Sequence, residues 1–140
     1  MIFQEGSISE TIYRLSILQQ TFIAEKLKTL QLNSIQARSL SYIYVYPGTI
    51  QRELAHYLGK QQATVTNVLK GLEERKLVYR EIPKSNERQK NIFLTKEGEH
   101  LVTQVNQLFE QLDEKVRKSL TKEEQNKIQG TLDKIEKDLS

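Results

Sequence analysis

The feature that most constrains the fold is a change in hydrophobic spacing near the middle of the chain. Four apolar residues recur at intervals of three and four, which places them on one face of a helix. They are Val65, Val68, Leu69 and Leu72. In residues 78–82 and again in residues 91–95, apolar and polar side chains alternate with the period of a β-strand. The sequence therefore predicts a helix followed by an antiparallel hairpin, with residues 83–90 as its loop.

Two helices are predicted ahead of this unit. Residues 7–10, Ser-Ile-Ser-Glu, have the spacing of a capping box, so we expect a helix to begin there and to run to about Leu30. Its apolar face consists of Ile8, Ile12, Leu15, Leu18 and Phe22. The cap signal returns at residues 33–36 and predicts a second helix, which Pro47 and Gly48 end. The inward residues of this second helix are Ala37, Leu40 and Ile43.

A short third helix is predicted between the second helix and the helix that contains Val65. We expect Thr49 to cap its start and Gly59 to end it in left-handed geometry, which makes the following turn tight. Its inward face is formed by Ile50, Leu54, Ala55 and Leu58. Gly71, inside the fourth helix, costs about 1 kcal/mol relative to alanine, and we interpret it as a point of close packing against a neighbouring helix.

Two more helices follow the hairpin. The first begins after Thr95, and the second opens with a capping box at residues 121–124. Their apolar faces are formed by Leu101, Val105, Leu108, Leu112 and Val116, and by Ile128, Leu132, Ile135 and Leu139. No internal repeat or flexible linker interrupts the chain. The expected fold class is mainly α with a small β-hairpin, in the order helix, helix, helix-turn-helix, hairpin, helix, helix.

The composition excludes several classes of function. The 140 residues suit one folding unit, and the absence of cysteine excludes disulfides, thiolate metal sites and a cysteine redox switch. No apolar run approaches the ~20 residues of a membrane span, and no signal peptide is recognisable, so we expect a cytoplasmic protein. The net charge is +3, but residues 60–90 carry eight basic and four acidic side chains, a local excess of +4. A solvated basic surface explains this excess as well as a phosphate-binding surface does.

The fourth helix has the composition of a surface that reads base edges. With its apolar residues turned inward, it presents Ala63, Thr66, Asn67 and Lys70 on the opposite face. Asparagine can form two hydrogen bonds with adenine, alanine and threonine can touch a thymine methyl group, and lysine suits phosphate or guanine. A bland solvated face more often carries pairs of glutamate and lysine. Because a helix-turn-helix with a two-stranded wing fits DNA, we favour DNA reading over a solvated face.

The chain resembles the MarR/SlyA family of winged-helix regulators. The strings that carry the resemblance are Glu53-Leu54-Ala55, Ala63-Thr64-Val65-Thr66, Leu72-Glu73-Glu74-Arg75-Lys76-Leu77-Val78, and Arg88 to Leu94-Thr95-Lys96-Glu97-Gly98. Their spacing matches the family's without a gap. The flanking helices also fit the family in length and order, so the resemblance covers essentially the whole chain. Each string alone is weak, whereas the set is specific.

The resemblance implies one MarR-type domain over residues 1–140, a winged helix-turn-helix with N- and C-terminal dimerisation helices. The DNA-binding lobe would span residues 34–95, and the dimerisation helices residues 1–33 and 96–140. The family's pattern implies an obligate homodimer on double-stranded DNA, with the fourth helix in the major groove and the wing tip near the minor groove. The DNA-binding candidates carried over by position are Gln61, Gln62, Ala63, Thr64, Thr66, Asn67 and Lys70, with Lys84, Arg88 and Lys90 on the wing. Arg88 stands where the family usually places its minor-groove arginine.

This sequence departs from the family's pattern at four positions. Asn86 replaces the usual wing aspartate, which puts a carboxylate partner for the wing arginine in doubt. Gln61 replaces the usual serine cap, Asn67 stands where arginine is common, and Lys76 replaces a turn glycine. We infer an altered operator preference rather than lost binding.

No catalytic or metal site is expected. His56 and His100 are the only histidines, and neither has a second histidine within helical reach, so a structural role is favoured over metal binding. The sequence shows no paired acid and base, no glycine-rich phosphate loop and no Ser/His/Asp arrangement. We therefore expect a protein that is not an enzyme and needs no cofactor.

Tyrosines suggest a place for a small effector. Tyr42 and Tyr46 share one face of the second helix, and the resemblance places this helix beside a pocket between the dimer and DNA-binding lobes, where phenolic effectors often bind. Tyr13, on the first helix, completes the candidate pocket. Core or interface packing explains the same tyrosines equally well.

The leading hypothesis is a ligand-responsive repressor that binds a pseudo-palindromic operator as a homodimer. Its two recognition helices would sit about one DNA turn apart, ~34 Å, to reach successive major grooves. One alternative is a helical protein-interaction module whose winged helix does not read DNA. A second alternative is a small enzyme, against which the lack of a convergent polar set argues.

Overall fold

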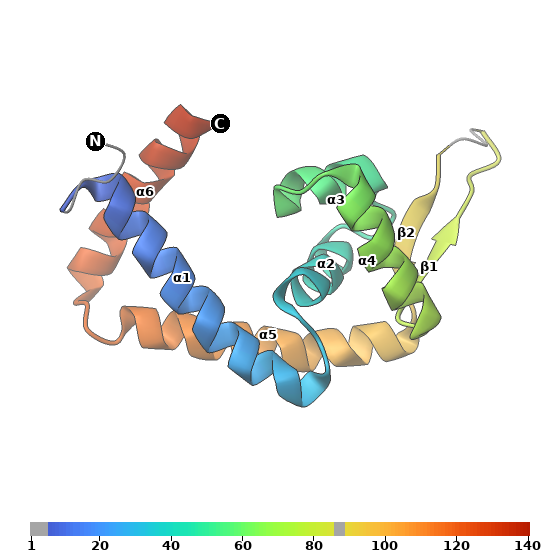
Figure 1. Cartoon of the computed structure of the whole chain (residues 1–140), viewed down its shortest axis with the longest axis horizontal. Coiled ribbons are helices and arrows are strands. Elements are labelled where there is room, and N and C mark those ends of the chain that lie inside the picture. Colours follow the sequence, from blue (N-terminus) through green and yellow to red (C-terminus); the bar gives the residue numbers. More distant parts are fainter. Residues whose placement is uncertain (1–5, 86–88) are drawn as a thin grey trace.

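The computed structural model describes residues 6–85 and 89–140, and within them it has the predicted order of elements (Figure 1). The helices and strands are α1 (Ile8–Leu27), η1 (Lys28–Leu30), α2 (Ser34–Val45), α3 (Gln51–Leu58), α4 (Gln62–Glu74), β1 (Val78–Glu81), β2 (Asn91–Leu94), α5 (Lys96–Arg117) and α6 (Lys122–Leu139). The first predicted helix ends three residues early as an α-helix, because its last turn tightens into the 3₁₀ helix η1. The fold class predicted from the hydrophobic spacing is confirmed.

The predicted caps form at three of the helix starts. The Ser7 hydroxyl accepts a hydrogen bond from the Glu10 amide at 3.2 Å at the start of α1. At the start of α2, Asn33 and Gln36 bond each other's backbone amides, and Thr121 and Glu124 do the same at the start of α6. These bonds satisfy amides that have no partner within the helix, which is why the sequence locates these helix starts so well.

Two local predictions are wrong. Thr49 does not cap α3: the N-cap is Ile50, with no side-chain bond, and the Thr49 backbone instead pairs with Ile92 of β2. The threonine is drawn into the sheet because its carbonyl accepts the Ile92 amide at 2.9 Å. Gly71 is not a point of close packing, since a Cβ at that position would meet nothing within 4 Å.

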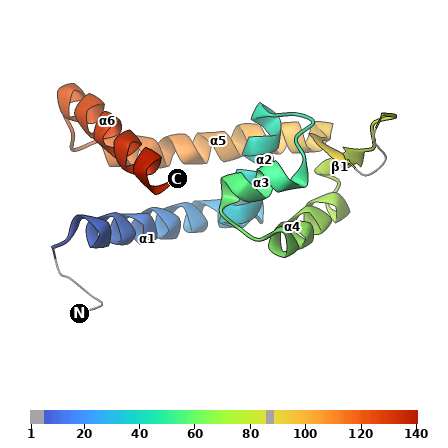
Figure 2. The same ribbon diagram turned by 90° about the horizontal axis from the view of Figure 1, so that it is seen from above.

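The chain divides into two groups of elements that α5 connects. We call α2, α3, α4, β1 and β2 the winged lobe, and α1 together with α6 the terminal arm. In Figure 1 the winged lobe and the arm lie at opposite ends of the molecule, and α5 runs beneath both. The view from above shows the same separation, with the hairpin at the far end from both termini (Figure 2).

The core lies in the winged lobe and along α5. Fully buried side chains come from α2, α3, α4, β2 and α5, and they include Leu40, Ile43, Leu54, Leu69, Leu72, Ile92 and Val105. The inner end of α1 joins this core through Ile23 and Leu27. No residue of α6 is buried. The winged lobe is therefore a packed unit, whereas most of the arm is not covered by its own chain.

Candidate nucleic-acid interface

The helix α4 is held with one face in the core and the other in solvent. Val65, Leu69 and Leu72 are completely buried, and Val68 is partly buried. Each of the four residues assigned to the opposite face, Ala63, Thr66, Asn67 and Lys70, is exposed. The predicted orientation of this helix is thus confirmed, and its outer face is free to meet a ligand as large as a DNA groove.

The turn between α3 and α4 fixes where the exposed helix begins. Gly59 has a positive φ of 64°, and its amide and that of Lys60 bond to the last carbonyls of α3. This is the glycine-ended turn that the sequence predicts. Gln61 is the N-cap of α4 and makes no side-chain cap bond, as expected for a residue that replaces serine.

A glutamine of α3 bonds the first turn of α4. The Gln51 side-chain amide donates to the Gln62 carbonyl oxygen at 3.1 Å and to the Thr66 hydroxyl oxygen at 2.7 Å. At the other end of α4, the Arg75 guanidinium donates to the Gln31 carbonyl oxygen at 2.8 Å. Both ends of the exposed helix are therefore tied to neighbouring segments, which limits its movement.

The hairpin is joined to α4 by an ion pair. In the hairpin Val78 pairs with Leu94 and Glu81 with Asn91 in an antiparallel register. The guanidinium Nε of Arg80 lies 2.6 Å from a carboxylate oxygen of Glu73, and the arginine side chain is largely buried. A charge-assisted bond of this kind fixes the direction of the hairpin relative to the helix.

A cationic hollow of about 480 Å³ lies between the starts of α3 and α4 and the hairpin. Its lining is formed by Ile50, Gln51, Arg52, Gln62, Arg80, Gln89, Lys90 and Ile92. Arg52, Arg80 and Lys90 carry a positive charge and no lining residue carries a negative charge, while the charge of Arg80 is paired with Glu73 outside the lining. A concave surface with these cations beside an exposed helix is suited to a phosphodiester backbone.

The sequence-predicted DNA-binding residues that the structure describes are all exposed, on α4 and on the hairpin loop. On and before α4 they are Gln61, Gln62, Ala63, Thr64, Thr66, Asn67 and Lys70, and on the loop they are Lys84 and Lys90. Arg88 lies outside the described residues, together with Asn86 and Glu87. The minor-groove role of Arg88 therefore stays a prediction.

Residues 32–90 match the family model described as the MarR family. The chain is also similar over its whole length to MepR of S. aureus in a crystal structure with DNA. The two sequences are 27% identical, the match covers 99% of this chain and 100% of that one, and the TM-score is 0.87. Residues 32–90 thus carry the MarR-family pattern, and the whole chain has the fold seen in MepR. The regulator fold inferred from the sequence strings is thereby confirmed.

Two further solved structures share this MarR-family fold. SlyA is 22% identical with a TM-score of 0.89, and the match covers 96% of this chain and 94% of that one. A MarR-family transcriptional regulator from Listeria monocytogenes, solved with a 26mer DNA, is 24% identical with a TM-score of 0.89, over 96% of this chain and 89% of that one. The helices of the arm, which the family model does not match, are therefore part of the shared fold.

One departure from the MarR pattern is visible in the backbone. Lys76, which replaces a turn glycine, has a positive φ of 60°. Its amide bonds the Glu73 carbonyl and the Leu77 amide bonds the Leu72 carbonyl, so the turn after α4 keeps the bonding of a glycine-ended helix. The lysine adopts the left-handed conformation because the buried Leu77 must be brought back onto the core.

The sequence interpretation missed four residues of the candidate interface. These residues line the cationic hollow but belong neither to the exposed face of α4 nor to the wing residues that the sequence predicts to bind DNA. They are Gln51, Arg52, Arg80 and Gln89. The sequence did contain a signal for Arg80, because the alternation in β1 places its side chain on the same side of the strand as the buried Val78. Gln51 had none, because its partner Thr66 is fifteen residues away and only the folded turn brings them together.

The predicted effector tyrosines are only partly brought together. The rings of Tyr42 and Tyr46 lie 4.8 Å apart between centroids, and Tyr57 of α3 stacks on Tyr42 at 4.7 Å. Tyr13 lies on α1 of the arm, exposed, and among the described residues it makes no ring contact with this cluster. We refer to Tyr42, Tyr46 and Tyr57 as the tyrosine cluster.

Two other kinds of site are absent from the part of the chain that the structure describes. No group of three or more histidine or acidic side chains is placed to hold a metal ion. None of the helices is both long enough and apolar enough to cross a membrane.

Proposed function

We propose that this chain is a sequence-specific regulator of transcription that binds double-stranded DNA as a homodimer. The observation that carries the proposal is the exposed polar face of α4 beside a cationic hollow of about 480 Å³. A helix with this face fits the major groove, while the cations of the hollow would neutralise phosphates. The likeness to MepR, which was solved with DNA, supports the same reading. Such a regulator would act in the cytoplasm, where a bacterial chromosome lies.

The helix α4 and the hairpin loop would make different kinds of contact with DNA. Asn67 and Thr66 would contact base edges; their exposure on the outer face of α4 supports this role. Lys84 and Lys90, on the hairpin loop, would meet phosphates and add affinity for any DNA sequence. The ion pair between Arg80 and Glu73 would keep these two contact regions in a constant relation.

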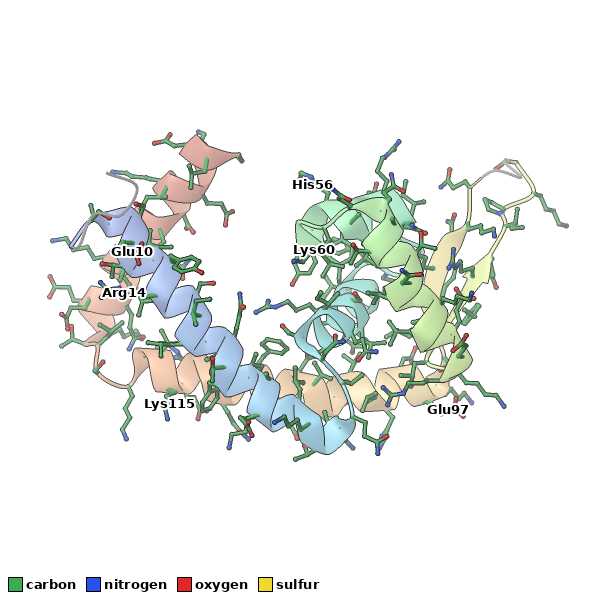
Figure 3. The ribbon with its side chains drawn as sticks, viewed as in Figure 1. Glu10, Arg14, His56, Lys60, Glu97 and Lys115 are labelled. Carbon is green, nitrogen blue, oxygen red and sulfur yellow. The ribbon has the colours of Figure 1, made fainter. Side chains whose placement is uncertain are left out.

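Dimerisation is supported by the uncovered apolar side chains of the arm. Ile8, Ile12 and Leu15 of α1 and Ile128 and Leu132 of α6 are exposed in the single chain. A mostly apolar groove of about 250 Å³ lies between α1 and α5, lined by Leu15, Leu18, Gln19, Phe22, Leu112, Lys115 and Val116. Lys115 of α5, which is labelled in Figure 3, has its amino group 5.0 Å from the centre of the Phe22 ring. A second copy would cover these surfaces, since apolar patches of this size are seldom left in water.

A small planar effector would act through the tyrosine cluster, whose adjoining rings, one pair tilted and one pair stacked, offer a surface for an aromatic acid or phenol. The recognition helices of a dimer must lie about one DNA turn apart, ~34 Å. An effector that favours another separation would therefore lower affinity for the operator and release the DNA. On this basis we propose a repressor that an effector inactivates.

The proposal is tested by measuring affinity for an operator and for scrambled DNA at several salt concentrations. We expect the operator to bind about 10³-fold more tightly than scrambled DNA, or better. Lys84→Ala and Lys90→Ala should each weaken binding to both DNAs and lower the salt slope by about one unit. Equal and weak binding to every DNA would contradict the proposal and favour a protein-interaction module. Robust turnover of a substrate would instead favour the second alternative, a small enzyme.

A further inference from the structure

The side-chain amide of Gln51 uses both of its hydrogens on the first turn of α4. One goes to the Gln62 carbonyl oxygen at 3.1 Å and the other to the Thr66 hydroxyl oxygen at 2.7 Å. Gln51 is the first residue of α3, so the bonds run between the two helices of the helix-turn-helix. The amide therefore sets the rotation of the Thr66 side chain as well as the position of the helix.

The Thr66 hydroxyl has no hydrogen left for a base. Its one hydrogen is donated to the Gln62 carbonyl oxygen at 2.9 Å, and one of its lone pairs accepts the Gln51 amide. A hydroxyl in this state cannot donate to the oxygen or nitrogen acceptors that guanine and thymine present in the major groove. The parts of the exposed side chain that stay free are one lone pair, which can only accept a hydrogen bond, and the methyl group.

We infer that Thr66 selects thymine through its methyl group, and that Gln51 is the positioning residue that imposes this mode of reading. The inference rests on the proposed placement of α4 in the major groove. Ala63 supports it, because a residue three positions earlier lies on the same face of a helix, and its methyl group extends the apolar contact. The thymine methyl is the one apolar group that the four base pairs present in the major groove.

The residue next to Thr66 makes the predicted operator sequence more specific. Asn67 follows Thr66 directly, is exposed, and carries an amide suited to adenine. Each half of the operator should therefore contain a thymine that is recognised by its methyl group close to an adenine that is recognised by hydrogen bonds. A threonine with a free hydroxyl would not favour thymine in this way.

The experiment replaces each thymine of the selected operator with deoxyuridine, one position at a time, because this exchange removes only the methyl group. For the parent protein we expect one thymine in each half-site whose replacement weakens binding about fourfold, the effect of one buried methyl group. Thr66→Val, which keeps a methyl group and lacks the hydroxyl, should retain this ratio. Thr66→Ser, which keeps the hydroxyl and lacks the methyl group, should bring the ratio close to one.

The positioning role of Gln51 is tested with Gln51→Met, which keeps the length of the side chain and removes its donors. We expect the thymine-to-deoxyuridine ratio to fall below the parent value, because the Thr66 hydroxyl is then held only by its bond to the Gln62 carbonyl and the rotation of the side chain is less restricted. Gln107→Met, the same exchange on an exposed site of α5, is the matched control and should leave the ratio unchanged. An unchanged ratio in Gln51→Met, with a folded protein by circular dichroism, would overturn the positioning role.

The outcomes separate this inference from the function on which it rests. If the parent selects an operator but no thymine is sensitive to deoxyuridine, methyl reading is wrong and the regulator function stands. If Thr66→Ser keeps the sensitivity of the parent, another residue reads the methyl group and the inference also fails. If the parent selects no operator at all, the proposed function fails and takes the inference with it.

Discussion

The winged lobe and the terminal arm are both built from amphipathic helices, but only the winged lobe buries its apolar faces within the chain. Leu54, Leu69 and Leu72 are completely covered in the lobe. In the arm, Ile8 is 74% exposed and Leu139 is 83% exposed. The apolar face of a helix therefore shows that something covers it, but not whether the cover comes from the same chain.

Charge separates the two regions as well. Residues 60–90, which contain α4 and the first strand of the hairpin, carry the local excess of +4, whereas residues 91–140 carry eight basic and ten acidic side chains. A basic surface beside a packed core suits a polyanion, while a nearly neutral surface with exposed apolar residues suits another protein. The difference agrees with DNA at one end of the molecule and a second copy at the other.

The largest effect should come from removing the arm's last helix. A chain ending after Leu120 lacks α6, and we expect it to dissociate or aggregate, because the apolar residues of α1 would lose their cover in the dimer. Sedimentation velocity measures this directly. An unchanged and well-folded dimer would show that α6 is not part of the interface.

A point variant tests the same assignment with α6 in place. Leu132→Asp puts a carboxylate on the apolar face of α6 and should weaken the dimer strongly. Asn126→Asp adds the same charge on the opposite face and is the matched control. If both variants sediment as the parent does, the apolar face of α6 does not hold the dimer.

The next prediction compares the effect of the same substitution, leucine to alanine, in the winged lobe and in the terminal arm. Leu69→Ala in the winged lobe should lower the free energy of unfolding by about 2–5 kcal/mol, since it leaves a cavity in a closed core. Leu132→Ala in the arm should lower the free energy of unfolding by less. This decrease should depend on protein concentration, because the substitution acts through association of two chains. Urea unfolding at two protein concentrations distinguishes the cases. A concentration-independent cost for Leu132→Ala would contradict the comparison.

A smaller effect concerns recognition by the winged lobe. Asn67→Ala should relax base preference at one operator position and cost about 1–3 kcal/mol of binding free energy, because two hydrogen bonds to a base edge would be lost. Binding-site selection on the parent and the variant measures the change. An identical set of selected sequences would mean that Asn67 does not contact bases, and phosphate contacts alone would then account for binding.

The sequence predicted most of this fold because its signals are local. Helix starts follow from caps three residues apart, and the switch from helical to alternating spacing locates the hairpin. Thr49 was misjudged because a long-range bond to Ile92 outweighed its tendency to cap. The exposed face of α4 was predictable from spacing, but the contact between Gln51 and Thr66 was not, since it exists only after the turn at Gly59 has formed.

The smallest effect compares the two glycines that lie inside helices, Gly71 of α4 in the winged lobe and Gly130 of α6 in the arm. A Cβ added at either position would meet nothing within 4 Å in the single chain. Alanine should therefore stabilise each helix by about 1 kcal/mol through helix propensity alone. Thermal unfolding without DNA measures this gain.

The two glycines differ in whether a second copy of the chain could pack against them, since only Gly130 lies in the arm. Gly130 is two residues from both Ile128 and Leu132, a rotation of about 200° along the helix, so it lies on the face of α6 opposite the apolar residues. If the dimer uses only the apolar face, Gly130→Ala gains as much as Gly71→Ala, and the dimer dissociates at the same concentration as the parent. A variant that loosens the dimer would mean that the partner packs closely against Gly130. The polar face of α6 would then be buried as well, and the arm would insert between helices of its partner rather than lie against them.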